Sequence, residues 1–227
     1  RETSNLIYGL EFLFYIQLFG KCGILEKRGA MKMYTNQQHA KTQYNGIILL
    51  SSYIHRLFVQ QSVEIRLLNE KTHWKLDQYK EMLNDVSLMM SMFEQTKDLT
   101  VNQHDKLIEI YSQTNDQFSK YFKPEPTFLE KVAIVASSFY GERHLNEKII
   151  HLSKLFDVTI ASDYEKRIQF YDERIQLMDF VVHALSQGDD LKPDLVQQIE
   201  MWYSNVNSIK QPIMDDLSKI PLLLNAN

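Results

Sequence analysis

Two stretches of the chain carry the same ladder of apolar side chains. Within each ladder the apolar positions are spaced by three and four residues in the same order, and the second ladder lies 92 residues after the first. This spacing keeps an apolar stripe on one face of an α-helix. The pattern therefore predicts equivalent amphipathic helices at 75–95 and 167–187. The two ladders are Leu76, Tyr79, Leu83, Val86, Met90 and Phe93, and Ile168, Tyr171, Ile175, Met178, Val182 and Leu185.

The sequence after each ladder is also repeated. A short polar link follows, at 97–100 and 189–192, and leads into a second amphipathic stretch. When 75–116 is aligned with 167–208, eight of the 42 positions are identical. Pro193 suits the first turn of the helix after its link, because an N–H group there has no partner within the helix. Each half of the chain is therefore expected to hold a helix, a link and a second helix.

A third helix is predicted upstream of each pair, here with an offset of 86 residues. The six-residue difference is assigned to a loop at 157–162, after which Ser162 or Asp163 could cap the next helix. The tandem serines in these helices are interpreted as structural, because small side chains let another helix approach closely. The matching residues are Ile48, Ser51, Ser52 and Tyr53 in the first half and Ile134, Ser137, Ser138 and Phe139 in the second.

The sequence thus predicts an all-α fold, a helical bundle built from two tandem three-helix repeats plus a short C-terminal helix after Pro212. The repeats are expected at 34–122 and 127–224, packed together as one domain. Two prolines within 123–126 separate them, because proline stops a helix. Residues 1–33 are expected to be an N-terminal apolar segment outside the two repeats.

The composition favours long helices and argues against a nucleic-acid partner and against an intrachain disulfide. Only 7 glycines and 5 prolines occur in 227 residues, so turns are few. The net charge of −4 and the lack of a basic cluster denser than Glu26–Arg28 predict no nucleic-acid partner. The lone Cys22 excludes an intrachain disulfide and suits a reducing compartment, so a cytoplasmic location is expected. A composition rich in Lys, Asn and Ile is typical of a low-GC bacterium or its phage.

The most apolar run, 6–19, is interrupted by Glu11. It is shorter than the roughly 20 residues that a spanning helix needs, so no stable membrane span is predicted. A secretory signal or anchor is not favoured, because Arg1 is the only cationic residue before the run and Lys21 stands where a lipoprotein signal needs a small residue. Two other interpretations remain open. Residues 27–31 could be encoded by a purine-rich ribosome-binding site, which would make Met31 or Met33 the natural start and the preceding residues a translated leader. Alternatively, the segment is an ordinary peripheral amphipathic helix.

The strongest candidate for chemistry is the group His144, Glu147 and His151. Spacings of three and four residues place all three on one helical face. Imidazole and carboxylate are suitable ligands for zinc, iron or manganese. However, the group flanks the apolar stripe of its own helix, where polar residues ordinarily lie, and one helix supplies too few ligands. A metal site is therefore not favoured, and these residues remain its weak candidates.

A second pattern, Glu70-x-x-His73, has the spacing found in di-iron four-helix bundles. Such a centre needs the motif twice, yet at the 92-residue offset Ser162 and Glu165 replace the two ligands. The sequence also contains no glycine-rich phosphate loop, nucleophile elbow, zinc-protease motif or EF-hand loop. No catalytic residue and no cofactor are therefore predicted.

Two tandem three-helix units are similar in architecture to the phosphate-uptake regulator family. That resemblance would imply repeated acidic clusters for metals, which this sequence lacks. The function expected from the sequence is a non-enzymatic helical bundle that acts as a protein-interaction or regulatory module, binding another protein or a second copy. The alternative is a metal- or small-ligand-binding bundle, enzymatic or not, centred on His144, Glu147 and His151.

Overall fold

The computed structural model describes residues 28–69, 73–159 and 163–225. Within these ranges the chain is helical and has no strand, which confirms the predicted all-α class. The helices are α3 (Arg28–Leu68), α4 (His73–Thr96), α5 (Val101–Phe118), α6 (Phe128–Leu155), α7 (Tyr164–Gln187), α8 (Pro193–Ser208) and α9 (Lys210–Leu224).

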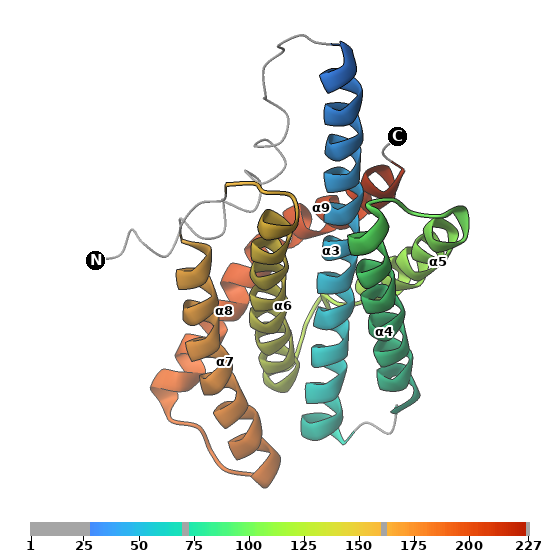
Figure 1. Cartoon of the computed structure of the whole chain (residues 1–227). Coiled ribbons are helices and arrows are strands. Elements are labelled where there is room, and N and C mark those ends of the chain that lie inside the picture. The colour runs from blue at the N-terminus through green and yellow to red at the C-terminus, as the bar shows by residue number, and fades with distance from the viewer. Residues whose placement is uncertain (1–27, 70–72, 160–162, 226–227) are drawn as a thin grey trace.

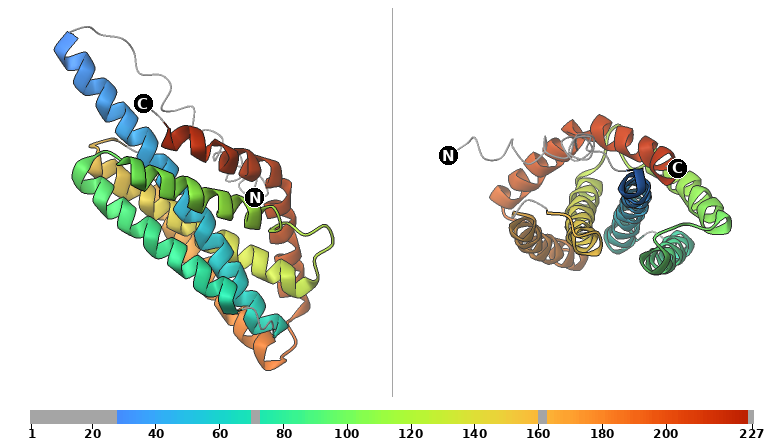
Figure 2. Two further views of the ribbon diagram at one scale, coloured as in Figure 1. Left: turned by 90° about the vertical axis from the view of Figure 1, so that its right-hand side faces the viewer. Right: turned by 45° about the horizontal axis from the view of Figure 1, so that its top comes forward.

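The helices form two layers. In the first, α7, α6, α3 and α4 lie side by side in that order (Figure 1). In the second, α8, α9 and α5 cover one side of the first layer (Figure 2). The most extensive helix contact joins α3 and α6 at the centre, while α4 packs on α3 and α7 packs on α6. The opposite side of the first layer is left without a covering helix among the described elements.

Local sequence explains where several helices begin and end. Thr100 and Thr127 cap α5 and α6, and each forms a reciprocal capping box with the residue three positions later. Pro193 opens α8, as predicted. Gly188 ends α7 with a positive φ of 83°, a conformation that glycine adopts without strain. These signals fix the short links between the paired helices.

All twelve ladder positions of α4 and α7 are buried or half-buried. All of them except Leu76 and Ile168 contribute to two apolar clusters on either side of the α3–α6 contact. In one cluster Tyr44 of α3 stacks on Phe93 of α4, with ring centroids 5.4 Å apart. In the other, Phe139 of α6 meets Trp202 of α8 edge to face at 5.2 Å. Helices α3 and α6 therefore tie both clusters together.

The helix bounds add detail to the predicted organisation. Helix α3 already begins at Arg28, so position 34, expected to start the first repeat, lies inside it. Helix α9 begins at Lys210, two residues before Pro212. The apolar run at 6–19 and Cys22 lie outside the described residues. None of the described helices is long and apolar enough to cross a membrane.

Candidate functional site

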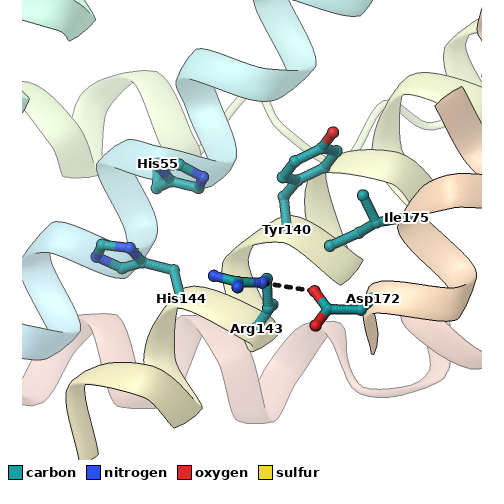
Figure 3. A pocket seen from close by; sticks show the side chains of 6 residues that line it. All are labelled: His55, Tyr140, Arg143, His144, Asp172 and Ile175. Atoms are coloured by element: carbon teal, nitrogen blue, oxygen red, sulfur yellow. Dashed lines mark hydrogen bonds and ion pairs between the residues drawn. The ribbon is translucent and has the colours of Figure 1, made fainter. Parts of the chain in front are cut away.

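An open groove of about 230 Å³ lies where α3, α6 and α7 meet. Helix α3 supplies one side chain, α6 supplies three and α7 supplies two (Figure 3). Five of the six carry a polar or titratable group. The lining residues are His55, Tyr140, Arg143, His144, Asp172 and Ile175.

Two histidines form the wall of the groove between α3 and α6. The rings of His55 and His144 stack almost in parallel, with an interplanar angle of 8° and centroids 4.8 Å apart. His144 Nε2 also shares a hydrogen bond of 2.9 Å with Ser51 Oγ of α3. Ser51 is only 2% exposed, so its hydroxyl is held in the helix seam and is not offered to solvent.

The opposite wall is a network of ion pairs. Arg143 Nε donates to Asp172 of α7 at 2.7 Å, and Nη1 donates to Glu147 of its own helix at 2.8 Å. The hydrogen bond that Arg143 donates to Asp172 is the main reason why the pKa of Arg143 is raised. Tyr140 donates to both carboxylate oxygens of Asp179 at 3.0 Å. Two carboxylates thus hold the guanidinium in place beside the histidine pair.

Both histidines are kept neutral at physiological pH. Burial lowers the pKa of His144 to about 3, and the neighbouring His55, Lys148 and Arg143 act in the same direction. Burial also lowers the pKa of His55, with a further contribution from Arg143. Neutral imidazole carries one N–H donor and one nitrogen acceptor, so each ring can both give and accept a hydrogen bond.

The structure gives the three predicted metal ligands separate partners. His144 turns toward α3, Glu147 binds Arg143, and His151 Nε2 lies 2.9 Å from Glu94 of α4. Of these three, only His144 lines the groove. In the second predicted pattern, His73 is exposed at the first residue of α4, whereas Glu70 lies outside the described residues.

The histidine pair is also poorly arranged to share one metal ion. The lone pair of an imidazole nitrogen lies in the plane of its ring. Two stacked, nearly parallel rings have planes that do not meet near the nitrogens, so a single ion cannot lie in both planes. Among the described residues, no group of three or more His, Cys, Asp or Glu side chains could hold a metal ion.

A buried ion pair lies next to the groove in the α3–α6 seam. Arg56 of α3 is 3% exposed, and its guanidinium pairs with Glu142 of α6. Burial opposes the charge on Arg56, but Glu142 and neighbouring tyrosines hold its pKa above the usual value. Tyr121 completes the polar seam by hydrogen bonding to Ser137 at 2.6 Å and to Ser138 at 3.1 Å.

Acidification should destabilise the fold through the histidine pair. Because the pKa values of both rings in the folded state lie below about 6.5, the unfolded chain binds more protons below that pH. Stability that is complete above about pH 6.5 should therefore fall by up to about 1.4 kcal/mol per pH unit for each ring. Urea unfolding at several pH values between about 7.5 and 5.5 measures this loss.

Two variants isolate the contribution of the groove to that loss. His144→Gln keeps a polar side chain beside Ser51 but cannot gain a charge, so its stability should fall less on acidification. His183→Gln is the control, because His183 is exposed on α7, and it should follow the wild type. Equal acid sensitivity in all three proteins would place the effect outside the histidine pair.

Comparisons with models of known protein families, with curated proteins and with solved structures give no significant match.

Proposed function

We propose that this chain is a non-enzymatic, cytoplasmic helical-bundle protein that binds another protein, or a second copy of itself, through the outer faces of α4 and α7. The observation that carries this proposal is a matched pair of exposed apolar side chains. Leu88 of α4 and Phe180 of α7 are each 61% exposed, and they correspond to each other at the 92-residue offset.

A tandem duplication supports treating these two positions as equivalent. Helix α3 contacts α4 and α5 as α6 contacts α7 and α8, and the two halves meet at the α3–α6 seam. Arg56 and Glu142 correspond at the 86-residue offset and form an ion pair with each other. In a twofold arrangement, a residue near the axis meets its own equivalent. We therefore propose that the bundle consists of two copies of a three-helix unit.

Exposure of one apolar residue would be ordinary, because isolated apolar side chains occur on most protein surfaces. Here the exposure recurs in both halves, and on α4 it extends along the helix. Met92, 43% exposed, follows Leu88 by one turn, and Trp74, 61% exposed, precedes it by about four turns on the same face. Tryptophan, phenylalanine and methionine are enriched in protein interfaces, and tryptophan is a frequent anchor there.

The contents of the groove support a function without catalysis. A serine next to a histidine could act as a nucleophile only if a substrate could reach its hydroxyl. Ser51 is buried and hydrogen-bonded within the seam. The strongly lowered pKa of His144 also makes it a poor base.

Site-specific photo-crosslinking tests the proposed faces. A benzophenone side chain placed at Leu88 or at Phe180 of the full chain should give discrete adducts in the cells that express it. The control positions are Asp105 of α5 and Gln197 of α8, which are exposed and also correspond at the 92-residue offset. Light scattering on purified protein shows whether the adduct partner is a second copy.

A paired substitution completes this test. Leu88→Gln combined with Phe180→Gln should abolish the complex and change the free energy of unfolding little, because both side chains are mostly exposed. Adducts that form equally well from positions 105 and 197, or a complex that survives the double substitution, would contradict the assignment of these faces.

A further inference from the structure

The groove between α3, α6 and α7 contains donors that no described residue satisfies. Arg143 uses Nε and Nη1 for its two carboxylates, but Nη2 has no hydrogen-bond partner within the described chain. The His55 ring makes ring contacts with His144 and Tyr140 and no hydrogen bond to any described residue. His144 engages Nε2 with Ser51, and its other ring nitrogen has no described partner.

The tautomer of His144 decides whether Nδ1, the ring nitrogen that does not contact Ser51, carries a proton and can donate a hydrogen bond. A buried serine hydroxyl that donates to Nε2 leaves the proton of the neutral ring on Nδ1. In that state the groove presents N–H groups from two imidazoles and one guanidinium. Figure 3 shows the Arg143 guanidinium lying between His144 and Asp172, with His55 on the neighbouring helix.

We propose that this groove binds a small tetrahedral oxyanion, such as free sulfate or phosphate, between the Arg143 guanidinium and the rings of His55 and His144. Several oxygens on one centre can accept from donors on different helices at the same time, and bonds to a charged guanidinium are among the stronger hydrogen bonds. The groove volume of about 230 Å³ leaves room for such an ion together with water.

The charges around the groove determine how tightly it is expected to bind an anion. Arg66, Arg143 and Lys148 are the cations that act on the lining residues, and they are balanced by Asp172, Asp179 and Glu147. The groove therefore has no large excess of positive charge. Binding depends on the geometry of the free donors, and Asp172 both positions Arg143 and repels the anion.

Because Asp172 repels the anion, its replacement should strengthen sulfate binding. A variant that was merely destabilised would bind sulfate more weakly. Asp172→Asn removes the repelling charge and leaves Arg143 with a weaker partner, so the variant should bind sulfate severalfold more tightly than the wild type. Loss of a donor should act in the opposite direction. Arg143→Met and His55→Ala should each weaken binding by about tenfold or more, because each removes a hydrogen bond to the anion.

The experiment is titration calorimetry of the full chain with sodium sulfate at constant pH and constant ionic strength, with sodium chloride as the reference salt. The control variant is Arg167→Met, which breaks another i,i+4 ion pair, with Asp163, outside the groove. Its sulfate affinity should equal that of the wild type. Circular dichroism confirms that each variant is folded.

Saturable sulfate binding that weakens in Arg143→Met and His55→Ala and tightens in Asp172→Asn supports the site. No saturable sulfate binding, or binding that these three substitutions leave unchanged, overturns it. A parallel titration with zinc chloride distinguishes the competing chemistry, because zinc binding that depends on His55 in the absence of sulfate binding would make the groove a cation site. The outcome does not depend on Leu88 or Phe180, so the interaction faces are tested separately.

Discussion

Replacing Glu142 with glutamine should lower the free energy of unfolding by about 3 kcal/mol or more. The substitution preserves the shape of the side chain but leaves the buried Arg56 guanidinium without a countercharge. A charge removed from water depends mainly on its countercharge, so loss of the countercharge costs much more than the pair contributed. Urea unfolding followed by circular dichroism measures the change, provided that the m value is conserved.

Replacing Arg56 instead of Glu142 should lower the free energy of unfolding by a smaller amount. The Glu142 side chain is 21% exposed, whereas that of Arg56 is 4% exposed. In Arg56→Met the remaining carboxylate therefore keeps some contact with water. Combining Arg56→Met with Glu142→Met should recover much of the lost stability, because an apolar pair needs no countercharge. A double substitution whose loss equals the sum of the two single losses would contradict this coupling.

Glu109→Gln provides the matched control for this cycle. Glu109 also belongs to an ion pair, with Lys106 on the same helix, but the Glu109 side chain is 57% exposed. Water screens such a pair, so its loss should change stability little. If Glu142→Gln behaves like Glu109→Gln, the seam is more open to water than the burial of Arg56 indicates.

The sequence was sufficient to predict the all-α class and several of the helices, because these helices carry their own local signals. The capping of α7 expected from Ser162 or Asp163 is an exception, since Asp163 precedes this helix without a side-chain capping bond. The ladder of apolar positions on α4 recurs on α7, and both ladders face the core. The proline-containing link at 123–126 separates α5 from α6, as expected. These features depend on residues a few positions apart, so they can be read along the chain. The position of α9 across α3 and α5 has no such local signal.

The candidate site could be predicted only in part, because it depends on which helices become neighbours. His144 was singled out by its spacing from Glu147 and His151, residues on the same helix. Its actual neighbours, Ser51 and His55, lie about 90 residues away on α3. Pairing of opposite charges between the two proposed copies could have suggested the Arg56–Glu142 contact, since these positions correspond at the 86-residue offset. Nothing local in the sequence identifies the groove between three helices.

Gly141→Ala should destabilise the protein by about 1–3 kcal/mol, the usual cost of overpacking a core. On an isolated helix the same change would stabilise, because alanine is the better helix former by about 1 kcal/mol. Here α3 approaches too closely for a methyl group, which would lie 2.6 Å from Arg56 Nε. Arg56 has little room to move, because it is buried and paired with Glu142. Ser52 of α3 also donates to the Gly141 carbonyl at 3.3 Å, which shows how closely the two helices approach.

Gly141→Ala should no longer destabilise the protein when the Arg56 side chain is removed. In an Arg56→Ala background the methyl group of Gly141→Ala occupies space that the arginine side chain has left. The second substitution should then be neutral or stabilising, because only the helix preference of alanine remains. A double-mutant cycle by urea unfolding measures the coupling between the two sites. Gly141→Ala that stabilises the otherwise unchanged protein would show that the α3–α6 seam accommodates a methyl group, and the close approach of the two central helices would then not depend on this glycine.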